Sequence, residues 1–348
     1  MGTRHNFIRL RPSQMDLLPA SMLWHCAATR RRVGDGRVSM TRMRHAPHPM
    51  ERVQITADLS FSRVVYGMWR LGDDIDTSPR HVQAKILACL DQGITTMDQA
   101  DIYGGYMAEE ILGNTLRAYP DLKSRIELVT KCDIIVPAGR HGGTARLKYY
   151  DSGRNHVTAS AEASLRLLGV DHIDLLLIHR PDPLVDPDET GRALDDLVQS
   201  GKVSAIGVSN FRPWDWSLLQ SAMQTRLAGN QIELSLGCTD PFTNGDLAFL
   251  QQRKVAVMAW SPLGGGAVLG AGGNEKLTAT LQQMAQEKGI DPGTLAVAWL
   301  LAHPARILPV IGTNTISRIR SLSEAVGVSL DRQDWFALYT AALGHEVP

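Results

Sequence analysis

From Val64 onward, short apolar runs alternate with longer segments whose apolar residues recur at helical spacing. The segment before the fourth run is an example, since Ala161, Leu165 and Leu168 fall on one helical face. This alternation is typical of repeated βα units and a parallel sheet. Eight runs are expected to form strands, at residues 64–66, 94–98, 126–131, 173–179, 205–209, 227–231, 255–260 and 307–311.

Eight such units in about 300 residues predict a closed (β/α)8 barrel, an α/β fold that forms one domain. The competing architecture, a doubly wound nucleotide-binding sheet, needs a G-x-G-x-x-G turn after its first strand. That turn is missing, because the glycine run that starts at Gly264 lies late in the chain and has other spacings. We therefore expect residues 50–348 to form a single TIM barrel. Long loops are expected at its rim over 132–156 and 264–274, with a last helix over 331–343 outside the barrel or near its mouth.

The composition is that of an ordinary soluble globular chain, with 348 residues, 44% hydrophobic content and 36 basic against 36 acidic side chains. The balanced charge indicates neither a nucleic-acid nor a membrane partner, and no apolar stretch approaches the roughly 18 residues of a membrane helix. The first 50 residues differ, since they hold nine Arg, no Lys and two acidic residues. We expect residues 1–49 to be a disordered or non-native extension, with an export signal and an electrostatic arm as the alternatives.

The four cysteines show no spacing typical of a metal site and are too few for a disulfide-stapled scaffold. Free thiols and a site without metal are therefore expected, which suits the reducing cytoplasm. Within the cytoplasm, a monomer or a small homo-oligomer is expected.

Polar side chains stand at the carboxyl ends of three of the predicted strands. Asp98 ends the second run and is followed by Tyr103, Lys131 ends the third run, and His179 ends the fourth. In a parallel barrel the carboxyl ends of the strands meet at one rim, so these four side chains are expected to surround a single pocket. Any one of them could be a structural ion pair or cap, but their joint placement favours catalysis.

Six motifs, in this order along the chain, resemble those of the aldo/keto reductase family. They are Asp98-Gln-Ala-Asp-Ile-Tyr103-Gly, Val129-Thr-Lys131, Leu177-Ile-His179, Gly207-Val-Ser-Asn210, Asn230-Gln231 and Trp260-Ser-Pro-Leu263. The resemblance extends from about residue 53 to the carboxyl end and leaves out only the amino-terminal extension. It implies a (β/α)8 barrel that uses NADPH to reduce a carbonyl.

The chemistry of that reaction explains the four residue types. Hydride transfer to a carbonyl leaves an alkoxide that needs a proton, and Tyr103 can donate it. The Lys131 ammonium is expected to lower the pKa of this phenol from its ordinary value near 10, and Asp98 to hold the ammonium charged and in place. His179 is expected to orient the carbonyl and stabilise the developing negative charge.

The resemblance also implies the residues that bind the cofactor. Ser209, Asn210 and Gln231 are expected to hydrogen-bond the nicotinamide carboxamide, and Trp260 to stack on the nicotinamide ring. Ser261, Leu263 and Gly264 begin the loop that is expected to lie over the pyrophosphate, where glycines allow close backbone approach.

After the eighth strand, Gly312-Thr313-Asn314 and Arg318 resemble the family's segment for the adenosine 2′-phosphate, which favours NADPH over NADH. An ordinary capped helix with a surface Arg is the alternative. The segment departs from the family pattern, since many relatives have a basic residue at the position of Gly312 and Glu-Asn at 321–322.

The resemblance gives little information about the substrate. Met68 and Trp69 resemble the family's pocket wall, whereas Asp101, Tyr106 and Arg180 are expected to shape structure or loops. The predicted function is NADPH-dependent reduction of a small aldehyde or ketone to an alcohol. The alternative is an NADPH-binding, redox-sensing or regulatory subunit with little turnover.

Overall fold

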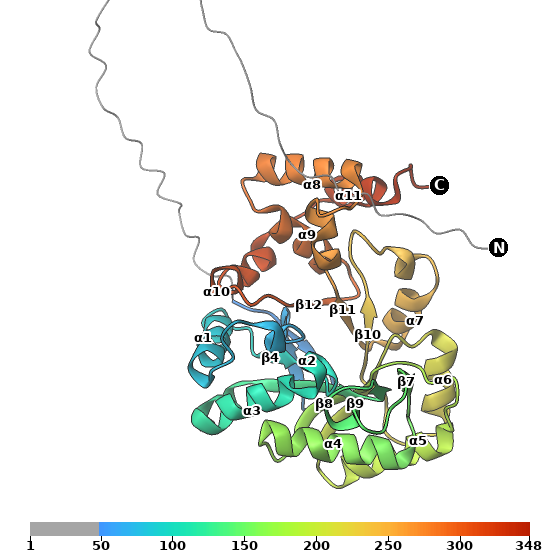
Figure 1. Ribbon diagram of the computed structural model, residues 1–348. Helices are drawn as coiled ribbons and strands as arrows, with labels where there is room; N and C mark the ends of the chain where they lie inside the picture. The colour runs from blue at the N-terminus through green and yellow to red at the C-terminus, as the bar shows by residue number, and fades with distance from the viewer. Residues whose placement is uncertain (1–48) are drawn as a thin grey trace, which may run out of the picture. The chain divides into compact units, whose positions relative to one another are not determined.

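The computed structural model describes residues 49–348, and all but the last residue of the predicted 1–49 extension lies outside the described part. Eight parallel strands close into one barrel (Figure 1). In order round the barrel they are β3 (Val65–Gly67), β4 (Thr96–Asp98), β5 (Glu127–Cys132), β8 (Ile173–Ile178), β9 (Val203–Ser209), β10 (Gly229–Glu233), β11 (Ala256–Trp260) and β12 (Leu308–Ile311). Each overlaps one of the eight predicted runs, so the (β/α)8 prediction is confirmed.

Helices separate the barrel strands along the chain, and the longer helices surround the barrel (Figure 1). They are α1 (Pro79–Leu90), α2 (Tyr103–Tyr106), α3 (Ala108–Ala118), α4 (Arg154–Leu168), α5 (Pro187–Gln199), α6 (Pro213–Ser221), α7 (Asp246–Arg253), α8 (Glu275–Lys288), α9 (Pro292–Leu301), α10 (Ile316–Ile319) and α11 (Arg332–Leu343). Local sequence fixes several of their starts. The side chains of Ser78, Asp186 and Asp291 cap α1, α5 and α9, and each is followed by a proline at the first helical position.

The predicted last helix over 331–343 is α11, and it packs on the outside of the barrel. It contacts α8, and its Trp335 stacks on Trp299 of α9 with ring centroids 4.8 Å apart. Each of these two indoles donates its N–H to the backbone carbonyl of the other residue. The stacked pair, of which Trp299 is fully and Trp335 partly buried, therefore has hydrogen-bond partners for both indole N–H groups.

The predicted rim loops contain short elements of their own. In 132–156 these are β6 (Ile134–Ile135), η3 (Gly139–His141) and β7 (Tyr149–Tyr150), with β6 and β7 paired antiparallel. The loop at 264–274 contains η5 (Gly264–Leu269). The remaining 3₁₀ turns are η1 (Leu71–Asp73), η2 (Pro120–Arg125), η4 (Asp240–Phe242) and η6 (Leu322–Gly327).

A two-stranded hairpin at the amino-terminal end of the barrel has no counterpart among the predicted elements. It consists of β1 (Arg52–Gln54) and β2 (Ser60–Ser62), which pair antiparallel. Val53 and Phe61 on this hairpin belong to the same buried cluster as the side chains inside the barrel, among them Val65, Val129 and Leu175. The hairpin therefore covers the amino-terminal end of the barrel with apolar side chains.

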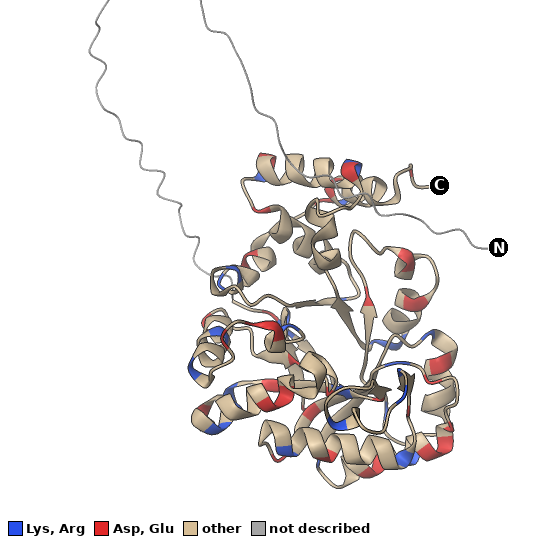
Figure 2. Cartoon of the chain, in the orientation of Figure 1, with Lys and Arg blue, Asp and Glu red and all other residues tan. Residues whose placement is uncertain are grey.

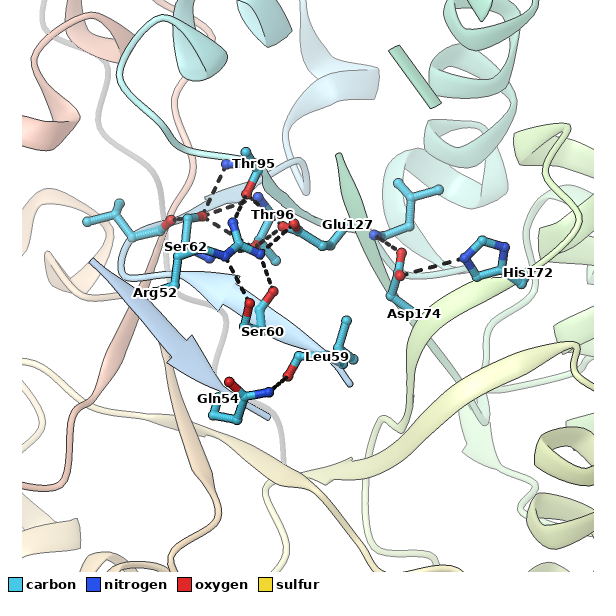
Figure 3. Close-up of polar contacts among 12 residues, drawn as sticks. Arg52, Gln54, Leu59, Ser60, Ser62, Thr95, Thr96, Glu127, His172 and Asp174 are labelled. Carbon is cyan, nitrogen blue, oxygen red and sulfur yellow. Dashed lines mark hydrogen bonds and ion pairs between the residues drawn. The ribbon is translucent and has the colours of Figure 1, made fainter. Parts of the chain in front are cut away.

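Polar contacts hold this hairpin to the barrel (Figure 3). The Arg52 guanidinium donates to Glu127 Oε1 at 2.7 Å and to Thr95 Oγ1 at 2.9 Å. Glu127 Oε2 in turn accepts from Thr95 and Thr96 at 2.7 and 2.8 Å. A carboxylate and a guanidinium that share their hydrogen bonds in this way make directional contacts stronger than those between neutral groups.

Acidic and basic residues are interspersed along the helices around the barrel (Figure 2). Among the described residues, no helix combines the length and the apolar character that crossing a membrane requires. The large buried clusters lie inside the barrel and between its strands and the outer helices. The carboxyl ends of the strands are thereby held on a packed scaffold.

Candidate active site

Lys131 is the centre of a polar cluster at the carboxyl ends of β4 and β5. Its Nζ donates to both carboxylate oxygens of Asp98 at 2.8 Å, and to the Tyr103 hydroxyl at 3.0 Å. It also donates to the backbone carbonyl of Gln99 at 2.8 Å. The Lys131 and Asp98 side chains are 0% and 2% exposed, so the ammonium sits in a buried and fully hydrogen-bonded position.

These contacts set the ionisation of the cluster. Burial lowers the pKa of Lys131, but Asp98 and Tyr103 raise it, and the net direction is upward, so the ammonium stays charged at neutral pH. Burial raises the pKa of Tyr103 while Lys131 opposes that rise, and here too the net direction is upward. The lowering by Lys131 expected from the sequence is therefore present but outweighed by burial. The phenol remains protonated at neutral pH.

Tyr103 lies at the start of a turn with an unusual backbone. Gly104, Gly105 and Tyr106 all have positive φ, at 58°, 65° and 74°. The positive φ favours glycine at 104, and a Cβ there would also lie close to the backbone of Gly72, at 3.2 Å. The turn brings the Tyr103 ring edge-on to Trp69 at a centroid distance of 6.3 Å.

His179 follows the carboxyl end of β8 and faces Tyr103. The two rings meet edge to face with centroids 6.0 Å apart. Burial, Lys131 and Arg180 lower the pKa of His179 well below its ordinary value, so the ring is neutral at pH 7. Its buried Nδ1 has no hydrogen-bond partner among the described residues. All four side chains predicted to meet are thus close together at one rim.

The residues predicted to hold the nicotinamide form a network beside this cluster. Asn210 Nδ2 donates to Ser209 Oγ at 2.8 Å, and Trp260 Nε1 donates to Asn210 Oδ1 at 2.9 Å, which fixes the indole. Gln231 Nε2 donates to Asp98 Oδ1 at 2.8 Å. The sequence did not indicate this last contact, which joins the predicted cofactor residues to the Lys131 cluster.

The loop after β11 begins with backbone suited to close approach by a ligand. Ser261 and Gly264 have φ of 50° and 55°, and Leu263 is only partly buried. The next residues, Gly265 and Gly266, have φ of 65° and 106°, and an added Cβ would meet no atom at Gly265 and only Ala271, at 3.9 Å, at Gly266. The backbone amides of this segment can therefore be approached without a side chain in the way.

The residues of the segment after β12 differ in their exposure. Gly312 and Thr313 are partly buried, and Arg318 on α10 is exposed. The side chain of Asn314 donates to the backbone carbonyl of Arg70 at 2.7 Å and accepts from Lys85 Nζ at 3.1 Å. The Asn314 amide is thus engaged by contacts within the protein.

The two residues predicted to line the substrate pocket lie in different environments. Trp69 is 55% exposed beside Tyr103 at the rim, whereas Met68 is 1% exposed and belongs to a buried apolar cluster. Of the two, only Trp69 has a surface that a substrate can reach.

Arg180, assigned to loop structure by the sequence, extends over the Trp260 ring. Its guanidinium carbon lies 5.7 Å from the centroid of the Trp260 ring, and its charge contributes to the lowered pKa of His179. The only feature of the sequence that could have placed Arg180 near the site is its position directly after His179.

Comparison with known proteins identifies the class that this barrel and cluster define. The model of the Aldo/keto reductase family matches residues 63–341, and the chain belongs to that family. It is 62% identical over 298 residues to the 6-dehydroglucose reductase of Agrobacterium fabrum. This match covers 86% of this chain and 100% of the relative. It is 39% identical over 298 residues to the 6-dehydroglucose reductase of Novosphingobium aromaticivorans, covering 83% of this chain and 94% of the relative.

A solved structure gives the same fold. The aldo/keto reductase from Klebsiella pneumoniae, in complex with NADP and acetate, superposes with a TM-score of 0.66 at 26% identity, over 80% of this chain and 90% of that one. The comparisons confirm the family resemblance and the oxidoreductase class.

Proposed function

We propose that this protein is an NADPH-dependent reductase that converts an aldehyde or ketone to an alcohol at the Tyr103 pocket. The observation that carries the proposal is the Lys131 ammonium, which contacts both Asp98 and the Tyr103 hydroxyl within 3.0 Å. A phenol that is protonated at neutral pH and hydrogen-bonded to a buried ammonium is suited to donate a proton and to be stabilised afterwards as a phenolate.

The residues present fit a nicotinamide dinucleotide. Trp260 offers a flat ring held by Asn210, and Ser209 and Gln231 supply hydroxyl and amide groups for a carboxamide. The open glycine backbone at Gly265 suits a pyrophosphate. NADPH bound in this place supplies the hydride. The NADP complex of the Klebsiella pneumoniae relative supports this assignment.

The roles of the four polar side chains follow from their contacts. Tyr103 donates its proton to the carbonyl oxygen as the carbon–oxygen double bond is reduced, and its phenolate is then reprotonated from solvent. Lys131 stabilises that phenolate, and Asp98 keeps the ammonium charged and fixed. The neutral His179 ring can donate one N–H to the carbonyl oxygen, which orients the substrate.

We further propose a sugar aldehyde as the substrate class. Two relatives that carry the name 6-dehydroglucose reductase match nearly their whole length, one of them at 62% identity. In 6-dehydroglucose an aldehyde replaces the primary alcohol at C6, and its reduction gives glucose. The exposed Trp69 ring and the Arg180 guanidinium at the pocket offer an apolar face and several N–H donors, which are the groups that sugars bind.

The test is NADPH oxidation against a panel of carbonyls that includes 6-dehydroglucose, simple aldehydes and ketones, with intact protein and Tyr103→Phe. We expect turnover with the sugar aldehyde, and a loss of roughly a hundredfold or more in the variant. Tyr119→Phe makes the same chemical change at the end of α3 and should leave turnover unchanged. If the intact protein binds NADPH tightly but reduces none of the carbonyls in the panel, the result would contradict the proposal and favour the regulatory alternative.

A further inference from the structure

The turn that carries Tyr103 lies directly against the long loop that follows β5. The Tyr106 hydroxyl donates to the Ile134 carbonyl at 3.2 Å and accepts from the Val136 amide at 3.1 Å. At Gly139 on this loop, a Cβ would lie only 2.6 Å from the carbonyl oxygen of Gly105. The loop and the turn therefore touch over several residues, with no room for a side chain at Gly139.

The turn keeps backbone hydrogen bonds, among them Tyr106 N–H to the Ile102 carbonyl at 3.3 Å, but its backbone conformation is unusual. Its three consecutive positive φ values, at Gly104, Gly105 and Tyr106, interrupt the helical pattern within α2. A backbone of this kind persists only where its surroundings hold it. The position of the Tyr103 hydroxyl therefore depends on neighbouring segments.

One ion pair joins the two segments. Arg140 Nη2 on the loop donates to Asp101 Oδ2 at 2.6 Å, and also to Ser160 Oγ on α4 at 3.1 Å. The Asp101 side chain is 0% exposed and that of Arg140 is 28% exposed. Asp101 lies two residues before Tyr103, and its backbone amide donates to the Lys131 carbonyl at 3.0 Å. The pair thus connects the loop to the segment between Asp98 and Tyr103.

The surroundings of Asp101 leave Arg140 as its principal counter-charge. Its Oδ1 has no hydrogen-bond partner in the part of the chain that the structure describes. Burial, and then the Glu109 carboxylate on α3, raise the pKa of Asp101 to about 7, and Arg140 opposes this rise. The other titratable groups around the pair are Cys132 and Asp133 at the end of β5, Tyr106 on α2, His141 beside Arg140 and His156 on α4. The ionised form of Asp101 is therefore held mainly by Arg140.

We propose that Asp101 and Arg140 act as a positioning pair. The pair connects the long loop after β5, residues 133–152 and hereafter the 133–152 loop, to the turn that carries Tyr103, and so determines the position of the Tyr103 hydroxyl. The pair acts within the protein, through the contacts of Arg140 with Asp101 and Ser160, and its effect is exerted through Tyr103. This inference rests on the proposed function for its kinetic readout, but the coupling between loop and turn can be measured without turnover.

The kinetic test compares Arg140→Gln with Arg140→Lys. Displacement of a reacting group by about 1 Å can cost up to a hundredfold, so we expect Arg140→Gln to lower kcat roughly ten- to a hundredfold with NADPH affinity nearly unchanged. Arg140→Lys keeps the charge and should recover part of the loss, although a lysine cannot bridge Asp101 and Ser160 as a planar guanidinium does. Unchanged kcat in Arg140→Gln would overturn the proposal, as would an equal loss in NADPH affinity.

The matched control is Arg154→Gln. Arg154 begins α4 close to the same loop and pairs with Asp196, but both partners are about half exposed. An exposed pair contributes little, so kcat should stay at the intact value. A loss equal to that of Arg140→Gln would show that any lost ion pair nearby lowers turnover, and would contradict a specific role for Asp101.

A pH profile separates positioning from general loss of stability. Since Arg140 holds the ionised form of Asp101, kcat of the intact protein should rise as the pH increases through about 7. Asp101→Asn, which has a similar shape but no charge, should lack this rise. A rise that persists in Asp101→Asn would overturn the proposal.

Hydrogen exchange tests the coupling in the absence of any substrate. In Arg140→Gln, amides of residues 101–106 should exchange faster together with those of the 133–152 loop, whereas Arg154→Gln should change neither. Faster exchange confined to the loop would contradict the proposal. Because this measurement needs no turnover, it stays decisive even if the reductase assignment fails.

Discussion

The two ends of the barrel treat their polar groups in opposite ways. At the amino end, the Arg52 guanidinium and the Glu127 carboxylate share hydrogen bonds with each other and with Thr95 (Figure 3). At the carboxyl end, buried polar atoms lack partners among the described residues. Four of these atoms, Gln99 Oε1, Asp101 Oδ1, Asp133 Oδ1 and His179 Nδ1, belong to residues just beyond the ends of β4, β5 and β8.

Backbone strain is more frequent at the carboxyl end. Of the six described non-glycine residues with positive φ, Tyr106, Asp133, Asn210 and Ser261 follow the carboxyl ends of strands. The other two, Lys254 and Arg306, come just before β11 and β12. Such conformations cost free energy and persist where the surrounding structure holds them. The amino end therefore contributes stability, while the carboxyl end keeps destabilising features that place its reactive groups.

The largest effect is expected from breaking the carboxyl-end cluster at its centre. Lys131→Met removes the ammonium from the Tyr103 hydroxyl and should lower kcat by roughly a hundredfold or more, with a much smaller change in NADPH affinity. Steady-state kinetics and NADPH fluorescence titration measure the two quantities. Equal losses in turnover and affinity would count against the role given to Lys131.

A smaller effect is expected at the edge of the same rim. Arg318 is exposed on α10, and Arg318→Ala should weaken NADPH by about tenfold, the typical contribution of a charge-assisted hydrogen bond, with NADH nearly unaffected. Binding titrations with both nucleotides provide the measurement. Parallel weakening of NADPH and NADH would show that Arg318 does not read the 2′-phosphate.

At the amino end the comparison predicts a loss of stability without a loss of activity. Glu127→Gln takes the charge from the acceptor of Arg52, Thr95 and Thr96, and should lower the free energy of unfolding by about 1 to 3 kcal/mol. Denaturant unfolding checks this value, and kcat at a temperature where the variant is folded should be unchanged. The control, Glu162→Gln, affects only the exposed pair with Lys202 and should cost less than about 1 kcal/mol. Reduced kcat in folded Glu127→Gln would break the division between the two ends.

The smallest effect concerns the pH dependence of stability. The folded protein resists protonation of His179, whose pKa is lowered by burial and by Lys131, whereas the unfolded chain binds this proton below about pH 6.5. The unfolded state therefore holds more protons in acid, and the free energy of unfolding should fall as the pH drops below that value. His179→Gln should show a shallower fall in denaturant titrations at pH 5 and 8. If the free energy of unfolding falls equally between pH 8 and pH 5 in both proteins, His179 is accessible to protons in the folded state.

The sequence by itself determined the barrel and the meeting of Asp98, Tyr103, Lys131 and His179. Alternating apolar runs specify eight buried parallel strands, and in such a barrel the carboxyl ends have only one rim at which to meet. The motifs that identified the family occur in a fixed order along the chain, and most of them lie at the carboxyl end of a strand. These features follow from local periodicity and order along the chain.

Only the tertiary structure decided which long-range partners these residues have. Arg140 reaches Asp101 across 39 positions, Gln231 reaches Asp98 across 133, and the hairpin that bears Arg52 closes the far end of the barrel. Burial also decided the net direction of the Tyr103 pKa, against the effect of its neighbouring lysine. Periodicity records which face of an element is buried, but hydrogen-bond partners and desolvation depend on distances between segments, and these are set only when the whole chain packs.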